Sequence, residues 1–477
     1  MHSPARHSLL LVEPAVSPPL DPGFRPASLG NRAFQEAVKS SNQGVPLRIS
    51  LERGDGSIST FETEVFDDDA PEAIANFAYA ERLLKFLLWQ RGAWRVMFGG
   101  PPELGDEMER TFSPHGERAF DTMFMGRTVY EQDFTLEVVP PFDVPDTKER
   151  STPMGRHLSG CRIGFDLGAS DRKTSAVIDG KDVFSEEIPW DPRSSQDWNY
   201  QYEGIKHSIQ RALEHLPRLD AIGGSAAGVY VNNRTMAASL FRGIPSRDFD
   251  QHIKPLFDRI GEEFGVPIVV VNDGEVTALA GAMSLESDRI LGVAMGSSEA
   301  AGYVDGKGNI TGWLNELAFA PVDYALEAPE DEWSGDVGCG VQYFSQQAVM
   351  RLSKVAGIKF DKALSVPERL VAVQELMAKD DDRAAMIYET VGVHLGYAIA
   401  HYADYYDIDK MLILGRVTTG KGGDVVLSQA RRVLKKEFPE LARRVEMMLP
   451  DEKLRRIGQA IAAASLPVLE ESEEADA

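Results

Sequence analysis

The sequence predicts an α/β protein in which central mixed sheets are flanked by helices, with an N-terminal α+β extension. Three observations lead to this prediction. From residue 162 onward, short apolar runs end in Gly, Ser or Asx loops and alternate with helical patterns. Before that point, residues 44–140 combine alternating strand patterns with one strongly apolar helix. The length of 477 residues exceeds what one ordinary hydrophobic core supports, so several domains are expected.

The N-terminal part of the chain predicts an arm followed by a small unit. Residues 1–43 are rich in Pro, Ser and Arg and have no period, which predicts an extended arm. Within the α+β unit at 44–140, residues 47–51 and 60–66 alternate around a Gly-Asp-Gly turn and predict a β-hairpin. A helix is predicted to begin at Pro71. No motif in this unit indicates its role.

The remainder of the chain predicts a linker, two lobes and a tail. Residues 141–160 are polar and predict the linker. The first lobe is expected at 161–285, where the continuous apolar run 266–271 is typical of a buried central strand. The second lobe is expected at 286–465. Residues 466–477 form an acidic tail whose charges are expected to be solvated.

The charge and composition restrict the classes of function. The chain carries 74 acidic and 50 basic residues, a net charge of −24, which repels nucleic acid and anionic lipid. Neither a nucleic acid nor a membrane is therefore expected as a partner. Two cysteines are too few for a disulfide framework and fit a reducing compartment. No apolar run has membrane-spanning length, so a cytoplasmic location is expected.

Four predicted strands end in short polar loops, at Asp166, Asn272, Gly296 and Gly415. Ligands of open α/β sheets bind outside the carboxyl ends of strands, so these loops are candidates for one site. Phosphoryl transfer requires donors for phosphate oxygens, a carboxylate for the metal and a carboxylate that orients the nucleophile. Asp273 follows a buried strand and suits the last role. An ordinary hairpin turn and a helix cap are the alternative interpretations of the first two loops.

The order and spacing of these segments resemble the ROK family of sugar kinases (repressor, open reading frame, kinase), over residues 162–465. The segments that carry the resemblance are Asp166-Leu167-Gly168-Ala169-Ser170 with Lys173, Asn272-Asp273-Gly274-Glu275, Met295-Gly296-Ser297-Ser298, Asn315-Glu316-Leu317-Ala318-Phe319 and Leu412-Ile413-Leu414-Gly415. They are similar, in that order, to the family's first phosphate motif, catalytic aspartate segment, second phosphate motif, sugar-contacting segment and adenosine motif. The resemblance implies the two-lobed actin-like ATPase fold, which is related to ribonuclease H.

The resemblance also implies an activity and a set of site residues. The activity is that of a glucokinase-like enzyme, which transfers the γ-phosphate of ATP to a hydroxyl of a hexose or related sugar with Mg²⁺. Asp273 would be the catalytic base. The sugar contacts would be Asn272, Glu316, Ala227 and Gly228. The ATP and phosphate contacts would be Asp166, which would hold Mg²⁺ through water, with Gly168, Ser170, Lys173, Gly296, Ser297, Ser298, Gly415, Thr418 and Thr419. A homodimer is the usual state of the family.

The chain departs from the family pattern at several positions. Phe319 stands where the family has a zinc-ligating histidine, and Cys339 alone remains of the family's cysteine cluster. One cysteine without a histidine cannot complete a tetrahedral site, so no structural zinc is predicted. Val341 stands where the family has a glutamate that contacts sugar. Glu299 lies in the second phosphate loop, where we expect it to add negative charge near a bound nucleotide.

These departures leave a second class of function open. A non-catalytic sugar- or nucleotide-binding relative, a pseudokinase or regulator, would keep the fold without turnover. An ATPase of the Hsp70 or actin type acting on protein is a third interpretation, which has no need of an Asn-Asp pair that contacts sugar. A DNA-binding repressor is disfavoured, because the N-terminal unit is acidic and has no helix-turn-helix pattern. The sequence does not identify the sugar.

Overall fold

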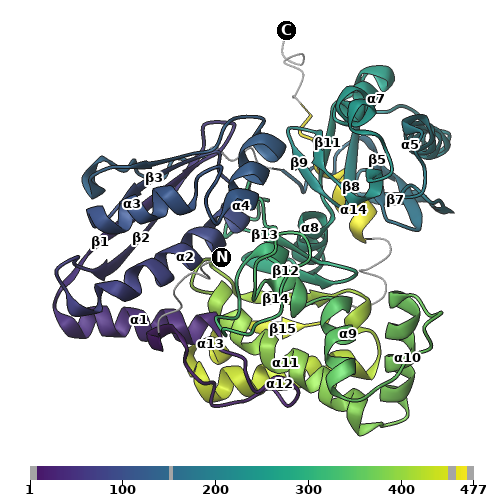
Figure 1. The fold of residues 1–477 in the computed structure, drawn as a ribbon. Helices are drawn as coiled ribbons and strands as arrows, with labels where there is room; N and C mark the ends of the chain where they lie inside the picture. Colours follow the sequence, from purple (N-terminus) through teal and green to yellow (C-terminus); the bar gives the residue numbers. More distant parts are fainter. Residues whose placement is uncertain (1–7, 150–153, 450–457, 470–477) are drawn as a thin grey trace. The chain divides into compact units, whose positions relative to one another are not determined.

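The computed structural model describes residues 8–149, 154–449 and 458–469 (Figure 1). The chain divides into two compact units, neither of them continuous in the sequence. Unit 1 comprises residues 1–150, 293–301 and 312–449, and unit 2 comprises residues 151–292, 302–311 and 450–477. Most of the predicted acidic tail, residues 470–477, lies outside the described residues.

Unit 1 begins with a four-stranded sheet in the order β2-β1-β3-β4 (Figure 1). Its strands are β1 (Gly44–Glu52), β2 (Ile58–Phe66), β3 (Arg95–Gly99) and β4 (Thr135–Val138). β1 pairs antiparallel with β2 and β3, and β3 pairs parallel with β4. The β-hairpin predicted from residues 47–51 and 60–66 is therefore confirmed.

The helix predicted after Pro71 is α2 (Ile74–Arg91), which is buried along almost its whole length. It is followed by α3 (Pro102–Thr111) and α4 (Ala119–Met123). A helix buried on all sides is ordinarily apolar throughout, but α2 also buries the charged residues Glu81, Arg82 and Lys85. Buried charges require ionic or hydrogen-bonded partners, and these residues find theirs in other segments of unit 1.

The extended arm predicted for residues 1–43 is wrong in its second half. Residues Ala27–Ser41 form the helix α1, which begins after Pro26 and ends at Asn42 in the left-handed conformation. The helix forms because Phe34 and Val38, four residues apart, bury one face against unit 1. The ring of Phe34 stacks on Tyr79 of α2 at 4.1 Å between centroids. The prediction relied on the composition of the segment, which is rich in Pro and Ser, and overlooked this short apolar face.

The rest of unit 1 contains a second four-stranded sheet and the C-terminal helices. The sheet has the order β13-β12-β14-β15, and β12 and β13 carry the chain between the two units. Its strands are β12 (Ile290–Met295), β13 (Glu299–Val304), β14 (Lys410–Leu414) and β15 (Glu446–Met448). The helices are α9 (Gln346–Val355), α10 (Val366–Ala378), α11 (Asp382–Tyr402), α12 (Lys421–Glu437) and α13 (Pro439–Arg444). Of these helices α11, with 21 residues, is the longest.

Unit 2 is built on a mixed five-stranded sheet in the order β11-β8-β5-β6-β7. Its strands are β5 (Cys161–Leu167), β6 (Asp171–Ile178), β7 (Lys181–Pro189), β8 (Ala221–Ala226) and β11 (Ile268–Asn272). β5, β8 and β11 run parallel, and β6 and β7 continue the sheet antiparallel. The predicted buried strand near residue 270 is β11, and the predicted mixed sheet is confirmed.

The helices of unit 2 are α5 (Trp198–Leu213), α6 (Ser246–Asp248), α7 (Leu256–Phe264), α8 (Asp273–Leu285) and α14 (Gln459–Ala464), and a small hairpin consists of β9 (Val229–Val231) and β10 (Arg234–Ala237). The apolar spacing of residues 249–264 predicts one continuous helix, but the structure interrupts it at Pro255. A turn of π-helix ends at Ile253, and α7 begins after Pro255. Proline lacks the N–H that a continuous helix needs there.

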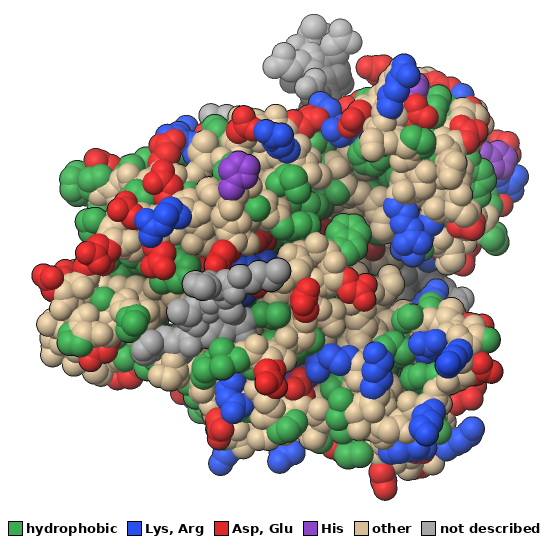
Figure 2. All heavy atoms as spheres, viewed as in Figure 1, with side chains coloured by type: hydrophobic (Ala, Val, Ile, Leu, Met, Phe, Trp, Pro, Cys, Tyr) green, Lys and Arg blue, Asp and Glu red, His purple; other side chains and the backbone are tan. Residues whose placement is uncertain are grey.

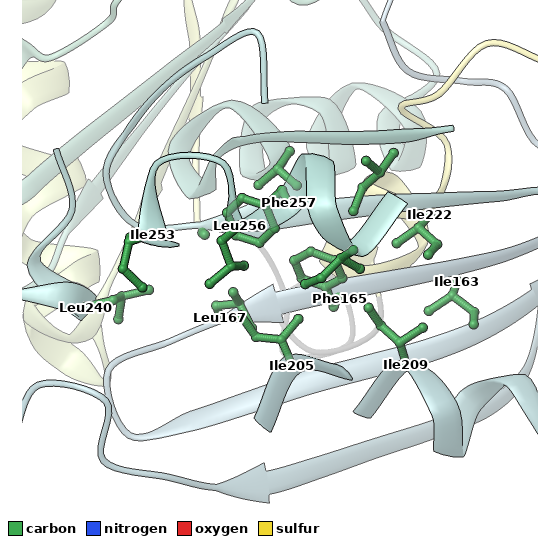
Figure 3. Close-up of a cluster of buried hydrophobic side chains, with 14 of the residues drawn as sticks. Ile163, Phe165, Leu167, Ile205, Ile209, Ile222, Leu240, Ile253, Leu256 and Phe257 are labelled. Atoms are coloured by element: carbon green, nitrogen blue, oxygen red, sulfur yellow. The ribbon is translucent and has the colours of Figure 1, made fainter. Parts of the chain in front are cut away.

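The core of unit 2 lies between the sheet and helices α5 and α7 (Figure 3). Alternate residues of β5, including Phe165, point into this cluster, and the ring of Phe165 lies 5.9 Å from that of Phe257. The other face of β5 contacts α14, because strand side chains alternate between the faces. A Cβ on Gly164 would lie 1.8 Å from the Ala460 carbonyl oxygen, so this close approach requires glycine.

Within the described residues, no helix has the length and apolar character needed to cross a membrane.

Candidate functional site

The strand ends of unit 2 bring three predicted site segments to one edge of the sheet. The parallel register places Asp166 of β5 opposite Ser225 of β8, and Ser225 opposite Val271 of β11. The carboxyl ends of parallel strands therefore lie at one level. This register explains why one sheet edge holds Asp166, the 226–228 loop and Asp273. The order of the strands in the sequence did not reveal it.

Asp166 is a buried carboxylate with two partners. Ser225 Oγ donates a hydrogen bond to Asp166 Oδ1 at 2.7 Å, and Lys173 Nζ lies 4.0 Å from Oδ2. Burial raises the pKa of Asp166, and the Ser225 hydrogen bond and the Lys173 charge oppose the rise. Ser225 was missed from the sequence. The signal that could have found it is its place in a strand whose predicted end is Gly-Gly-Ser-Ala-Ala-Gly.

Asp273 is the first residue of α8 and follows β11, which lies two strands from the β5 strand of Asp166 in the sheet. It stays partly exposed, and its carboxylate accepts a hydrogen bond from the Gly274 N–H at 3.0 Å. Burial, followed by the negative charge of Asp166, raises the pKa of Asp273 to about 6. A carboxylate with this pKa is ionised at pH 7 and still basic enough to accept a proton from a hydroxyl group.

Asn272 joins the β11 end to the 226–228 loop. Its Oδ1 accepts a hydrogen bond from the Gly274 N–H at 2.7 Å, so the helix-cap interpretation of this residue is confirmed. Its Nδ2 donates to the Gly228 carbonyl oxygen at 2.7 Å. The hydroxyl of Tyr230 donates to the Ala227 carbonyl oxygen at 3.4 Å. Three of the predicted sugar contacts, Asn272, Ala227 and Gly228, are therefore neighbours.

The predicted phosphate turn at residues 168–173 is a β-hairpin turn between β5 and β6. The Gly168 N–H donates to the Asp171 carbonyl oxygen at 2.9 Å, so this N–H group is engaged inside the turn. Ser170 Oγ is exposed and donates to Asp171 Oδ2 at 2.8 Å, and Lys173 Nζ lies 3.2 Å from Asp171 Oδ1. The side chains of Ser170 and Lys173 are thus the groups of this turn that could contact a phosphate.

Two predicted nucleotide loops meet within unit 1. The Gly296 N–H donates to the Ser298 carbonyl oxygen at 2.9 Å, which forms a tight turn with exposed Ser297 and Ser298 side chains. A Cβ on Gly415, whose φ is +93°, would lie 2.4 Å from the Met295 carbonyl oxygen. The end of β14 therefore packs directly against the end of β12, and only glycine permits this approach.

The adenosine segment continues from this contact. Thr418 is buried, and its Oγ1 donates to the Gly415 carbonyl oxygen at 3.0 Å. Thr419 is exposed. Thr418 therefore has a role within the loop, whereas Thr419 presents its hydroxyl group to solvent.

Glu316 is held by the N-terminal helix α2, a connection that the sequence gave no sign of. The N–H groups of Leu314, Asn315 and Glu316 donate to the last carbonyl oxygens of α2 at 3.3, 2.9 and 2.9 Å. The final carbonyl groups of a helix have no partners within it, so this segment satisfies them. The α+β unit at residues 44–140 therefore supports the segment predicted to contact sugar.

Phe319, which replaces the family's histidine, lies in an aromatic cluster. Its ring stacks on Trp89 of α2 at 4.2 Å and lies 6.1 Å from Phe120 and 6.3 Å from Trp333. Trp333 is 68% exposed. The position of a metal ligand in the family is thus occupied by an apolar contact with the N-terminal segment.

A buried ion cluster lies beside the position of the family's cysteine cluster. It consists of Glu81, Arg82, Lys85, Arg118, Asp121 and Asp336. Cys339 is fully buried and donates through Sγ to Asp336 Oδ2 at 3.8 Å, and burial raises the pKa of its thiol. No group of three or more metal-ligating side chains occurs in the described part of the chain. The absence of zinc stays a prediction.

The expectation that Glu299 adds charge near a nucleotide is wrong. Its side chain is 3% exposed, and burial raises the pKa of the carboxyl to about 8. Glu299 is the first residue of β13, and the alternation of strand side chains directs it inward, whereas Ser297 and Ser298 in the turn point to solvent.

Asp166 fits the prediction of a magnesium ligand. Mg²⁺ keeps several waters and is held through one or two carboxylates. The charge of Asp166 raises the pKa of Asp273, so the two carboxylates interact, and a cation at this edge would relieve their repulsion.

Two surface hollows lie away from the predicted site residues. An open groove of about 520 Å³ on α12 is lined by Ser428, Arg431, Arg432, Lys435 and Lys436. A hollow of about 280 Å³ beside the N-terminal sheet contains Asp67, Asp68, Asp69 and Gly100. Figure 2 shows acidic side chains spread over the face in view and basic side chains most numerous over α9 to α12. Neither hollow contains a predicted site residue.

Comparisons with known proteins agree with the fold. No protein-family model matches the chain. A glucokinase from Halalkalibacterium halodurans is 25% identical over 289 residues, which cover 57% of this chain and 84% of the relative. The crystal structure of a ROK hexokinase from Thermus thermophilus covers 64% of this chain and 97% of its own, with 18% identity and a TM-score of 0.50.

A ROK family transcriptional regulator, a homologue of the E. coli MLC protein, is similar to the same degree. Its structure covers 65% of this chain and 79% of its own, with 16% identity and a TM-score of 0.50. The resemblance to the ROK family and the predicted actin-like ATPase fold are confirmed. The chain is similar both to sugar kinases and to a regulator, so this similarity does not distinguish catalysis from regulation. The site residues must distinguish them.

Proposed function

We propose that the protein is an ATP-dependent sugar kinase that transfers the γ-phosphate of ATP to a hydroxyl of a hexose or related sugar. The observation that carries the proposal is the position of Asp273. It follows the parallel strand β11, is influenced by the charge of a second carboxylate, Asp166, and has a pKa raised to about 6. A protein that only binds sugar has no need of a general base in this place.

Each group has a role in the proposed reaction. Asp273 accepts the proton of the sugar hydroxyl as its oxygen attacks the γ-phosphate. Asn272, the 227–228 loop and Glu316 bind the other hydroxyl groups. Asp166 would hold Mg²⁺ through water, and Mg²⁺ neutralises phosphate charge when it is bound.

We expect accessible hydroxyl and ammonium groups to be the nucleotide contacts. Ser170 and Lys173 in unit 2, and Ser297, Ser298 and Thr419 in unit 1, carry accessible hydroxyl or ammonium groups for ATP. Gly296, Gly415 and Thr418 shape the loops from which the unit 1 groups project. A cytoplasmic location and a homodimeric state remain predictions from the sequence.

A non-catalytic sugar- or nucleotide-binding regulator is the second candidate. Phe319 and Val341 favour it, because Phe319 replaces a zinc-ligating histidine of the family and Val341 replaces a glutamate that contacts sugar. Phe319 instead packs against Trp89, and Val341 is buried. A regulator would bind sugar or nucleotide with Asp273 dispensable for its activity.

The test is phosphorylation of a sugar panel by the full chain. The panel contains hexoses, N-acetylhexosamines and polyols with ATP and Mg²⁺, and the sugar phosphate is detected by ³¹P NMR. Asp273→Asn is measured beside it, and Asp250→Asn, which changes a 64% exposed carboxylate on the surface, is the matched control. We expect one class of sugar to be phosphorylated by the wild type and the control. Sugar binding by calorimetry without turnover in the wild type would establish the regulator instead.

A further inference from the structure

Glu299 begins β13 directly after the exposed turn at residues 297–298, yet it is one of the most buried carboxyl groups of unit 1. Its Oε1 accepts a hydrogen bond from the hydroxyl of Tyr402 at 3.3 Å. Its Oε2 is inaccessible to solvent and has no hydrogen-bond partner among the described residues. A buried ionised oxygen without a donor is strongly unfavourable, so the surroundings of Oε2 decide what this carboxyl does.

Gly340 shows which atoms face Oε2. A Cβ built on this glycine would lie 2.2 Å from Glu299 Oε2 and 2.5 Å from the carbonyl oxygen of Leu317. Both oxygens therefore face the same glycine, and both are acceptors when the carboxyl is ionised. A proton on Oε2 converts this pair from two acceptors into a donor and an acceptor.

The titratable groups around Glu299 act on its pKa in opposite directions. Tyr402, the last residue of α11, and Glu316 beside Leu317 are the titratable groups that act on it. Burial is the largest influence and raises the pKa of Glu299. The Tyr402 hydrogen bond opposes this and the charge of Glu316 adds to it, and the pKa rises to about 8. Burial and the charge of Glu299 raise the pKa of Tyr402, which keeps its hydroxyl as a donor.

We propose that Glu299 is a positioning residue whose protonated carboxyl holds the Glu316–Leu317 segment in the geometry that binds sugar. The proposal rests on the proposed function, because it takes Glu316 as a sugar contact. The same residue fixes the start of β13, so it connects the turn at residues 297–298 to that segment within one unit. Loss of the proton places a second carboxylate beside Glu316 and repels the Leu317 carbonyl oxygen, and the segment shifts.

The test is sugar affinity as a function of pH. Glu299→Gln keeps the shape and the donor of the protonated acid and cannot ionise. Calorimetry with D-glucose and N-acetyl-D-glucosamine, and with any sugar that the panel identifies, is run from pH 6 to pH 9.5. For the wild type we expect affinity to fall about tenfold above pH 8, a change of about 1.4 kcal/mol. The fall should appear in KM for the sugar and not in kcat. For Glu299→Gln we expect no fall.

Two further variants and a stability readout keep the result interpretable. Gly340→Ala should weaken sugar binding at every pH, since its methyl group displaces Oε2. Glu440→Gln, at an 83% exposed carboxylate, should behave as the wild type. The Glu299 carboxyl is ionised in the unfolded chain and protonated in the folded state between pH 5 and pH 8, so a rise in pH over this range destabilises the wild type. Glu299→Gln has no such loss. Its thermal midpoint should therefore exceed that of the wild type by an amount that grows from pH 5 to pH 8.

The outcomes separate the two proposals. Sugar binding with the same alkaline fall in Glu299→Gln as in the wild type would overturn the positioning role and leave the proposed function standing. Weakened binding of Glu299→Gln at pH 7 would do the same. A wild type that binds none of these sugars at any pH would overturn the proposed function, and the positioning role with it.

Discussion

Replacement of Lys85 by methionine tests how the N-terminal segment is held in unit 1. Lys85 is fully buried, and its Nζ lies 2.9 Å from Asp121 Oδ1 and 3.1 Å from Asp336 Oδ2. The buried ion cluster contains three cations and three carboxylates, so Lys85→Met leaves one uncompensated negative charge. Removing one partner of a buried ion pair costs about 3–5 kcal/mol, and we expect a loss of this size in the free energy of unfolding.

The expected loss depends on pH. Burial is the largest influence on Glu81 and raises its pKa to about 7, so Glu81 is the member of the cluster that can take up a proton when Lys85 is absent. Protonation of Glu81 removes the excess charge. The loss should therefore be smaller at pH 6 than at pH 8.

The assay is urea unfolding followed by circular dichroism. The dependence of the free energy of unfolding on urea concentration should be the same in variant and wild type, so that their midpoints can be compared. Lys410→Met is the matched control, because Lys410 pairs with Glu446 at 2.9 Å on the surface and such pairs contribute about 0–1 kcal/mol. A second readout is the KM for sugar, which should rise because α2 holds the segment of Glu316. Equal losses for Lys85→Met and Lys410→Met would refute the reasoning.

Two other substitutions give separate tests. Gly302→Ala places a methyl group 2.2 Å from the Gly274 carbonyl oxygen, next to Asp273, and should cost about 1–3 kcal/mol in urea unfolding and lower activity; an unchanged midpoint would contradict this contact. Burial raises the pKa of Asp21, but His394 and Arg351 outweigh it and lower the pKa from 3.8 to about 2. Its contribution to stability is present above pH 4 and lost as the pH falls to 2, so Asp21→Asn should lose less stability over this range than the wild type.

The sequence was sufficient for the parts of the fold that depend on local pattern. Strand β11 followed from an unbroken apolar run, and the β1–β2 hairpin followed from alternation around a turn. Asp166 and Asp273 were predicted because each lies at the end of a strand pattern, in the loops Asp166-Leu167-Gly168 and Asn272-Asp273-Gly274. The structure adds the register that places the two carboxylates at one level.

The sequence was insufficient where a residue depends on partners far along the chain. Ser225 becomes a donor to Asp166 only through the pairing of β8 with β5, which no local pattern encodes. The support of Glu316 by α2 joins residues more than 200 positions apart. Glu299 was predicted to be exposed because it matches a position in the family's second phosphate loop. It is buried because it is the first residue of β13 and its side chain points inward.

The rate of sugar phosphorylation by Asp273→Asn, relative to the wild type at saturating ATP and Mg²⁺, tests the central claim most directly. We expect a fall in kcat of about 10²- to 10⁴-fold, the usual contribution of a general base, with sugar affinity and thermal midpoint retained. A variant that keeps the wild-type kcat would contradict the assignment of Asp273 as the base.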